Sequence, residues 1–222
     1  ESILISIGDF YADGVNGPMQ SQNLSNLYGK IVKVNINDLT SEIYSFGHRN
    51  PQGLYIDKNK NIFSTEHGPT GGDELNLVIQ NNNYGWPYAT YGTNYKSYDA
   101  YDKTAENLIK EWPVDKTNNT HDEYTKPLFS WGNQFGISNL IVYENDYFTK
   151  WNKNLIISSL ATKQLVRMIY DYENKSILYK ENIKVGKRIR DLILLNNGKI
   201  VLLTDRGKKL NEYPEIIIIS KK

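Results

Sequence analysis

The sequence predicts an all-β fold, and its internal repetition favours a β-propeller. Short segments rich in β-branched, aromatic and leucine residues alternate with turn residues, and the chain has almost no helical periodicity. A hairpin pattern recurs along the chain, as a radial repeat fold requires, because each blade buries its faces against its neighbours. A β-sandwich remains the open alternative, since it also consists of many short strands.

The strand candidates are separated by glycine, asparagine, aspartate and lysine, which interrupt extended structure. Turn signals include Asp-Lys-Asn-Lys at 57–60 and Asn-Asn-Gly at 196–198. The strands are expected, in chain order, at residues 3–7, 30–35, 54–56, 62–65, 75–79, 155–158, 165–170, 192–195, 200–203 and 215–220.

One strand–turn–strand pattern occurs twice. Residues 54–68 read Leu-Tyr-Ile-Asp-Lys-Asn-Lys-Asn-Ile-Phe-Ser-Thr-Glu-His-Gly, and residues 192–207 have the same layout and end in Thr-Asp-Arg-Gly. The opening residues 3–9, Ile-Leu-Ile-Ser-Ile-Gly-Asp, resemble the second half of a third copy. The chain is therefore expected to consist of recurring hairpins, each with polar residues and glycine at the end of its second strand.

Composition excludes several classes of function. The chain carries 26 basic and 25 acidic side chains, so its net charge of +1 gives no support for nucleic-acid binding or a membrane-surface role. The absence of cysteine excludes disulfides and cysteine-ligated zinc. No apolar run approaches the roughly 20 residues that a membrane span needs. Because the segment from Glu1 onward reads as the inside of a strand, we expect residues 1–222 to be the C-terminal portion of a longer domain.

Residues 88–126 differ from the rest of the chain. They are rich in tyrosine, asparagine, aspartate, lysine and threonine and have little apolar patterning. Long connections of this kind are uncommon in compact domains and often border a binding face. We therefore expect a long surface excursion between two blades.

Three loop motifs combine glycine and proline with charged and amide side chains. They are Gly-His-Arg-Asn-Pro-Gln-Gly at 47–53, Thr-Glu-His-Gly-Pro-Thr-Gly-Gly-Asp-Glu-Leu-Asn at 65–76, and Asn-Tyr-Gly-Trp-Pro at 83–87. A loop that only connects strands needs one or two such residues. Loops this dense bring backbone close to a ligand and fix polar side chains around it.

These motifs, in this order, resemble the glucose/sorbosone dehydrogenase family, which includes soluble quinoprotein glucose dehydrogenases and aldose sugar dehydrogenases. The resemblance resumes in Gly-Lys-Arg-Ile-Arg-Asp at 186–191 and Leu-Thr-Asp at 203–205, and it touches most of the chain outside 88–126. Glucose-oxidising members place a lysine where this chain has Ala161, so the resemblance is nearer to the aldose sugar dehydrogenase branch.

The resemblance implies a six-bladed β-propeller that binds pyrroloquinoline quinone (PQQ) and calcium, with about four blades represented in residues 1–222. The family oxidises the C1 hydroxyl of aldose sugars to lactones by hydride transfer to PQQ, and it passes electrons to an external acceptor. An exported protein, periplasmic or secreted, is implied as well. The alternative is a non-catalytic propeller that recognises a ligand or another protein, because one fold can host either function.

The implied cofactor contacts are mainly groups that suit a flat tricarboxylate. Planar guanidinium groups match carboxylates in a way that lysine does not. Arg188 and Arg190 alternate along a strand and so face the same side. Partner acids or solvent would also explain two arginines on one face. By resemblance the PQQ contacts are Arg49, Asn50, Gln52, His67, Arg188 and Arg190.

Calcium prefers carboxylate and carbonyl oxygens. By resemblance the cofactor calcium lies on the main-chain carbonyls of Gly68 and Pro69, and a second, structural calcium on Glu74 and the carbonyl of Tyr84. The alternatives are an ordinary Gly-Pro turn and a solvated acid.

The three histidines are too scattered for a zinc site. His67 is expected to line the cofactor pocket, His48 to bond backbone across a turn, and His121 to face water. None of them matches the histidine that serves the family as general base. By resemblance that histidine precedes Glu1, so we expect no catalytic base within this chain.

Overall fold

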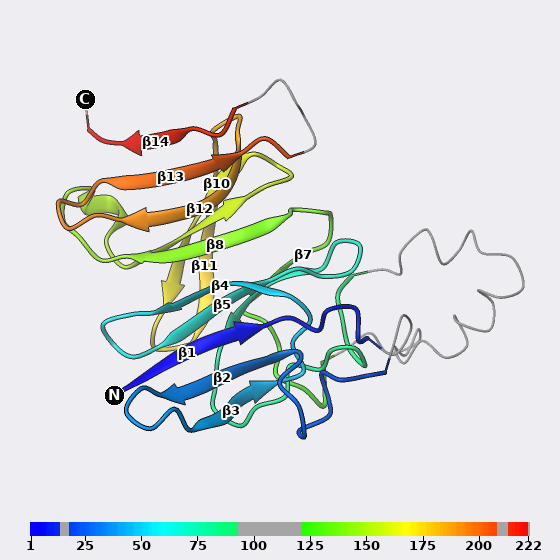
Figure 1. Ribbon diagram of the computed structural model, residues 1–222. Helices are drawn as coiled ribbons and strands as arrows, with labels where there is room; N and C mark the ends of the chain where they lie inside the picture. The colour runs from blue at the N-terminus through cyan, green and yellow to red at the C-terminus, as the bar shows by residue number, and fades with distance from the viewer. Residues whose placement is uncertain (14–17, 93–120, 208–212, 222) are drawn as a thin grey trace, which may run out of the picture. The chain divides into compact units, whose positions relative to one another are not determined.

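The computed structural model describes residues 1–13, 18–92, 121–207 and 213–221. Within these ranges the chain forms fourteen β-strands and one 3-10 turn, η1 (Thr149–Trp151), which confirms the predicted all-β fold (Figure 1). The same ranges contain no helix of the length and apolarity that crossing a membrane requires. Most of the expected excursion at 88–126 lies outside the described residues.

The chain divides into two compact units. The first comprises residues 1–54 and 62–133, and the second comprises residues 55–61 and 134–222. The first unit is built on two antiparallel sheets, with strand orders β1-β2-β3 and β4-β5-β6-β7. Their strands are β1 (Ser2–Ile7), β2 (Lys30–Asn35), β3 (Ser41–Phe46), β4 (Pro51–Ile56), β5 (Ile62–Glu66), β6 (Asp73–Leu77) and β7 (Phe129–Trp131).

The second unit also contains two antiparallel sheets, with orders β11-β10-β9-β8 and β12-β13-β14. Their strands are β8 (Ile137–Tyr143), β9 (Asn154–Ser159), β10 (Gln164–Asp171), β11 (Ser176–Lys184), β12 (Arg188–Leu194), β13 (Ile200–Asp205) and β14 (Ile216–Ile219). Strand β12 packs against β8 and β9, so the two sheets share one core.

In both units one sheet buries apolar side chains against the next. Ile31 of β2 meets Ile62 of β5 and Val78 in the first unit. A larger cluster in the second unit joins β8, β9 and β10 to β12 and β13, and its buried members are Ile141, Tyr143, Ile156, Leu165, Ile189, Leu192, Ile200 and Leu202. Stacking of successive antiparallel sheets is the packing that a repeat of hairpins predicts.

Each of the ten predicted strands overlaps an observed one, and the repeated pattern at 54–68 and 192–207 forms two hairpins, β4–β5 and β12–β13. Four observed strands were not predicted: β3, β7, β8 and β11. Strands β3 and β11 carry Ser, Glu, Lys and Asn among their apolar residues and are largely half-buried or exposed. Their sequences therefore show no clear alternation of apolar and polar side chains. A bulge between Ile137 and Leu140 interrupts the alternation in β8.

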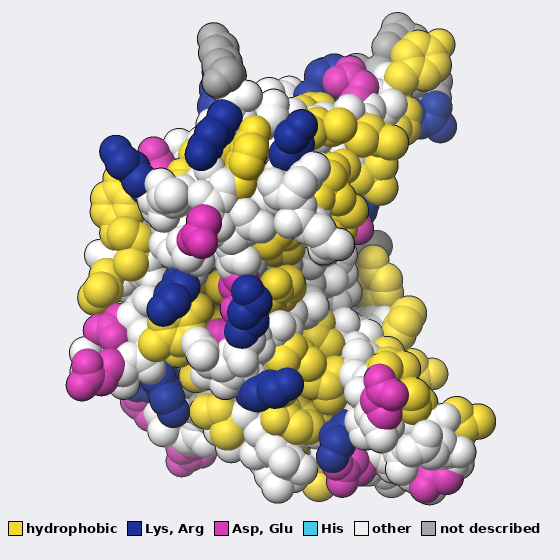
Figure 2. Space-filling view, turned by 90° about the vertical axis from the view of Figure 1, so that its left-hand side faces the viewer, with side chains coloured by type: hydrophobic (Ala, Val, Ile, Leu, Met, Phe, Trp, Pro, Cys, Tyr) yellow, Lys and Arg dark blue, Asp and Glu magenta, His cyan; other side chains and the backbone are white. Residues whose placement is uncertain are grey.

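Figure 2 shows one face of the molecule on which basic and acidic side chains are interspersed, in keeping with the net charge of +1. One basic group is buried instead. The Nζ atom of Lys30, at the start of β2, donates to the carbonyl oxygens of Gln20 (3.0 Å), Ser21 (2.9 Å) and Tyr28 (2.6 Å). Burial lowers the pKa of Lys30 to about 8. This ammonium group therefore fixes the loop between β1 and β2.

Replacing Lys30 should destabilise the protein strongly. Lys30→Met keeps the apolar stem but leaves three carbonyl oxygens without their donor. We expect the free energy of unfolding to fall by about 2–4 kcal/mol. The matched control is Lys33→Met in the same strand, which removes only an exposed ion pair to Glu42 and should cost about 0–1 kcal/mol. Urea denaturation followed by fluorescence measures both, and equal losses would contradict this role of Lys30.

Candidate functional site

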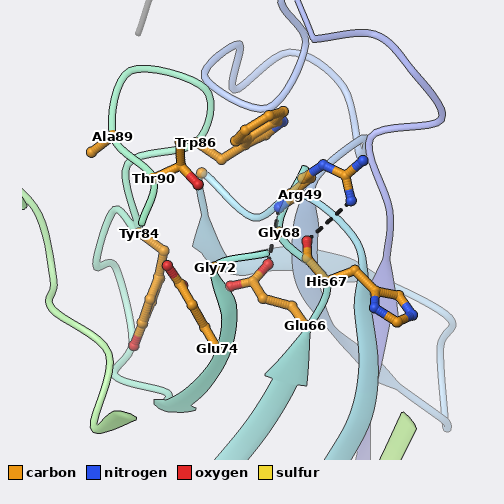
Figure 3. Close-up of a pocket in the computed structure, with 11 residues that line it drawn as sticks. Arg49, Glu66, His67, Gly68, Gly72, Glu74, Tyr84, Trp86, Ala89 and Thr90 are labelled. Atoms are coloured by element: carbon orange, nitrogen blue, oxygen red, sulfur yellow. Dashed lines mark hydrogen bonds between the residues drawn. The ribbon is translucent and has the colours of Figure 1, made fainter. Parts of the chain in front are cut away.

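The predicted loop motifs of the first unit meet around one pocket (Figure 3). Its walls come from the β3–β4 loop, the end of β5 with the loop that follows it, the start of β6, and the segment after β6. The pocket is partly open to solvent and has a volume of about 10 Å³, roughly the space of one water molecule. The lining residues are Gly47, Arg49, Glu66, His67, Gly68, Gly72, Glu74, Tyr84, Trp86, Ala89 and Thr90.

Two glycines allow the loops to approach one another. Gly47 has φ +72°, and a Cβ atom there would lie 2.1 Å from Oδ1 of Asn83. A Cβ atom at Gly68 would lie 2.1 Å from the carbonyl oxygen of Gly71 and 2.6 Å from that of Gly72. Any side chain at Gly68 would therefore fill a space bordered by carbonyl oxygens.

Arg49 is held in the pocket through both its backbone and its side chain. Its backbone N–H donates to Oε2 of Glu66 (3.0 Å), and its Nη1 donates to the carbonyl oxygen of His67 (3.1 Å). The guanidinium carbon lies 5.3 Å from the ring centre of Trp86, a cation–π contact. Burial lowers the pKa of Arg49, while nearby carboxylates, Asp9 foremost, oppose the shift. Because an arginine stays charged in either case, the pocket has a fixed positive charge.

Asp9 is a site residue that the sequence analysis missed. Its Oδ2 accepts a hydrogen bond from Nε1 of Trp86 (2.7 Å), and its backbone N–H donates to the carbonyl oxygen of Arg49 (2.8 Å). Burial raises the pKa of this carboxyl. The sequence signal was its place in the third copy of the hairpin pattern, directly after Gly8.

Two carboxylates of the pocket lining lie on paired residues of β5 and β6. Glu66 of β5 pairs directly with Glu74 of β6, and the side-chain amide of Asn76 donates to both, at 2.7 Å and 3.3 Å. Burial raises the pKa of Glu74 well above its ordinary value, and the charge of Glu66 raises it further. Glu74 is thus favoured as a neutral acid unless a cation approaches it. The alternative considered for Glu74, a solvated acid, is wrong, because Glu74 is buried.

The histidines differ in part from expectation. His67 lines this pocket, with 22% of its side chain exposed, and its role as a cofactor contact stays a prediction. His48 is fully buried and structural, but its ring contacts Oγ of Ser45 (2.8 Å) and Oε1 of Glu66 (3.3 Å) rather than backbone. The prediction that His121 faces water is wrong. It is 1% exposed, stacks on Tyr91, and places Nε2 3.8 Å from Oε1 of Glu74.

Three predicted residues lie near the pocket without lining it. The carbonyl oxygen of Asn50 accepts the backbone N–H of His67 (3.1 Å), and its side chain accepts Nε2 of Gln52 (3.0 Å). Pro69 is buried in the loop after β5, beside Gly92. Tyr84 does line the pocket, and its hydroxyl donates to the carbonyl oxygen of Leu77 (2.6 Å).

Arg188 and Arg190 belong to the second unit and share one carboxylate. Nε of Arg188 donates to Oδ1 of Asp205 (2.7 Å), and Nη2 of Arg190 donates to Oδ2 (2.6 Å). The prediction that the two side chains face the same side is confirmed, although a bulge lies between Ile189 and Asp191. Asp205 is the partner acid considered as an alternative. One carboxylate balances only one of the two charges, and 47% of the Arg190 side chain is exposed.

The comparison with known proteins decides the family. The sequence matches the family model described as Glucose / Sorbosone dehydrogenase over residues 1–212. The chain belongs to this family. It is 29% identical over 213 residues to aldose sugar dehydrogenase YliI of Escherichia coli strain K12, covering 89% of this chain and 54% of that protein. It is 30% identical over 226 residues to quinoprotein glucose dehydrogenase B of Acinetobacter calcoaceticus, covering 81% and 46%.

A crystal structure of a glucose dehydrogenase has a similar fold, with a TM-score of 0.81, 28% identity, and coverage of 100% of this chain and 61% of that one. The all-β, propeller-type fold and the family resemblance are thereby confirmed, while the number of blades stays a prediction. The chain spans about half the length of the curated relatives it matches.

The residue types present in each unit suit the cofactor and ion that the resemblance implies. Arg49 in the first unit, and Arg188 and Arg190 in the second, carry guanidinium groups, which match carboxylates. The carbonyl oxygens that border Gly68 are those of Gly71 and Gly72, and carbonyl oxygens suit a hard cation such as calcium. Within the described ranges no three His, Asp or Glu side chains are grouped so that they could hold a metal, so an ion here would also need main-chain oxygens.

The shared carboxylate gives a pH-dependent prediction. Burial raises the pKa of Asp205, but hydrogen bonds from Arg188 and Arg190 outweigh it and hold the pKa below its ordinary value. The stabilisation is therefore complete above about pH 4 and is lost as the pH falls through the native pKa. Asp205→Asn should lower the free energy of unfolding by about 1–2 kcal/mol at pH 7, and by clearly less at pH 3.

Urea denaturation at both pH values measures this difference. The exposed ion pair of Asp122 with Lys126 provides the control, because Asp122→Asn should change stability little, and to the same extent at both pH values. A loss for Asp205→Asn that is as large at pH 3 as at pH 7 would show that packing, not charge, is responsible.

Proposed function

We propose that the complete protein is a PQQ- and calcium-dependent dehydrogenase that oxidises the C1 hydroxyl of aldose sugars to lactones. Relatives named aldose sugar dehydrogenase and quinoprotein glucose dehydrogenase support the reaction class. The observation that carries the proposal is the arginine pair of the second unit. Arg188 and Arg190 share one carboxylate and so keep one positive charge that can bind an anion. In the first unit, the neighbours of Arg49 hold its guanidinium in place.

When bound, PQQ supplies the acceptor for the hydride that leaves C1 of the sugar. The protein's own residues bind and orient. Arg49, Arg188 and Arg190 would bind carboxylates of the cofactor, with Asn50, Gln52 and His67 as further contacts. The ring of Trp86 contacts the guanidinium of Arg49, and Asp9 fixes that ring by accepting its indole N–H. Arg49 therefore loses little conformational freedom when an anion binds.

Calcium would have two sites. The carbonyl oxygens of Gly68 and Pro69 would hold the cofactor calcium, and Glu74 with the carbonyl of Tyr84 would hold a structural one. The closely folded loop at Gly68 and the buried carboxyl of Glu74 support this assignment.

The remaining parts of the proposal concern location and partners. We infer export to the periplasm or secretion, with an aldose as substrate and an external electron acceptor. The balanced charge of the chain supports neither nucleic acid nor a membrane surface as a partner.

The decisive experiment is a dye-reduction assay. The full-length protein is loaded with Ca²⁺ and PQQ, and aldose-dependent reduction of an artificial dye is followed. Arg188→Ala or Arg190→Ala should weaken PQQ binding by about 10- to 100-fold, because each removes a charged hydrogen bond of about 1.5–3 kcal/mol. Arg167→Ala is the matched control, since it also breaks an arginine–acid pair of the second unit, with Glu181.

PQQ binding is measured separately by titration. A correctly folded protein that neither binds PQQ nor reduces dye would overturn the proposal and favour the alternative, a propeller used for recognition. Equal effects of Arg167→Ala and Arg188→Ala would show that only fold stability was tested.

Calcium binding at Glu74 should depend on pH. Because burial raises the pKa of this carboxyl, a cation must displace a proton, so calcium affinity should rise with pH. Ca²⁺ titrations followed by thermal unfolding at pH 6 and pH 8 measure this. Glu74→Gln should abolish that binding event with little loss of stability in the absence of calcium, since it mimics the neutral acid. An unchanged calcium titration for Glu74→Gln would contradict the assignment.

A further inference from the structure

A second pocket lies in the second unit, measures about 250 Å³ and is partly open to solvent. It is formed by four turns: the β4–β5 turn, the loop after β8, the turn before β9 and the β10–β11 turn. The side chains that matter are Lys58, Glu144, Asp146, Asn152, Lys153 and Tyr172. Its volume is near the lower end of small-molecule sites, which measure about 300–1,000 Å³.

This pocket lies at the opposite end of the sheet from the arginine pair. Arg188 begins β12 and pairs with Asp205 at the end of β13. The turn between these two strands lies at their other end, and there the carbonyl oxygen of Asn196 accepts Nδ2 of Asn145, a lining residue, at 3.3 Å. The pocket is therefore not an extension of that candidate cofactor contact.

The polar groups of the pocket are held in place by the protein itself. Oε1 of Glu144 accepts the backbone N–H of Lys58 (2.9 Å), and Nζ of Lys58 reaches the carbonyl oxygen of Glu144 (3.3 Å). Oδ1 of Asp146 accepts Nδ2 of Asn152 (2.9 Å). A carboxylate has about four lone-pair sites, so both acids keep acceptor capacity for a ligand.

The aromatic ring of Tyr172 is fixed as well. Its ring meets that of Tyr170 edge-on, with the ring centres 4.8 Å apart. Burial and, after it, the nearby charge of Asp57 raise the pKa of the Tyr172 hydroxyl. Asp57 is buried and is held in turn by the backbone N–H (2.7 Å) and the side-chain amide (2.9 Å) of Asn61. A half-buried tyrosine ring thus lines a polar pocket in a defined orientation.

The lining chemistry identifies the ligand class. Two lysines balance two acids, so the pocket favours neither anions nor cations. Amide, carboxylate and ammonium groups together offer donors and acceptors on several sides, which suits a ring of hydroxyl groups, and a fixed aromatic ring offers an apolar surface. We propose that this pocket binds a single neutral pyranose unit, as a carbohydrate-binding site separate from any site of oxidation.

The expected affinity is low. Most of the lining side chains are exposed, so water competes for their hydrogen bonds. A dissociation constant on the order of 1 mM corresponds to about −4 kcal/mol, which a few hydrogen bonds and one ring contact can supply. The inference does not depend on the proposed dehydrogenase activity.

The test uses methyl α-D-glucopyranoside, whose C1 oxygen carries a methyl group and cannot be oxidised to a lactone. Saturation-transfer NMR on the full-length protein measures its binding. Tyr172→Ala and Glu144→Gln should each weaken binding by about 10-fold or more. The matched control, Tyr179→Ala, removes an exposed tyrosine of the same β10–β11 hairpin outside the pocket and should leave binding unchanged.

Glu144→Gln preserves size and keeps the test decisive should Tyr172→Ala fail to fold. Absence of saturable binding to the wild type, or binding that both pocket variants retain, would overturn the inference. Dye reduction by the pocket variants should stay within about twofold of the wild type, since no residue of the cofactor site changes. A failure of this carbohydrate site is therefore distinguishable from a failure of the proposed oxidation.

Discussion

The buried carboxylate of Glu66 determines the geometry of the candidate site. It accepts the backbone N–H of Arg49 and the amide of Asn76, and it contacts the ring of His48. These partners come from the β3–β4 loop and from β6, so one side chain at the end of β5 joins three segments. A buried charge without partners costs several kcal/mol. Glu66 must therefore keep these partners, and this requirement fixes the position of the segments that supply them.

The position of Arg49 follows from this constraint. With its backbone fixed by Glu66, its guanidinium can reach both the carbonyl oxygen of His67 and the ring of Trp86. Gln22 supports Trp86 from the β1–β2 loop, where Lys30 holds the neighbouring Ser21. The guanidinium group of Arg49 is therefore in place before any ligand binds. Less conformational entropy is then lost when an anion binds to it.

The sequence predicts where the loops lie, but not which side chains from distant parts of the sequence contact one another there. Glycine and proline at 47–53 and 65–76 indicated close backbone approach, and the contacts at Gly47 and Gly68 are of that kind. His121 was misplaced because its burial depends on Tyr91 and Glu74, which lie far away in the sequence. Asp9 was missed for the same reason, since Trp86 is 77 positions from it. Local pattern predicts strands and turns, whereas such partners are determined only by how the sheets pack.

The repeated hairpin also explains why acids occur where they do. In the β4–β5 hairpin, Glu66 ends the second strand and binds the backbone of Arg49, just before the first strand. In the β12–β13 hairpin, Asp205 occupies the matching position and binds the side chain of Arg188, which begins the first strand. Each hairpin thus uses a carboxylate at its open end to fix an arginine there. The Thr-acid-x-Gly pattern in the sequence therefore marks a structural role of the acid. Glu66 binds the backbone N–H of Arg49, whereas Asp205 binds the guanidinium of Arg188 itself. This difference determines how much positive charge each arginine can offer to an anion.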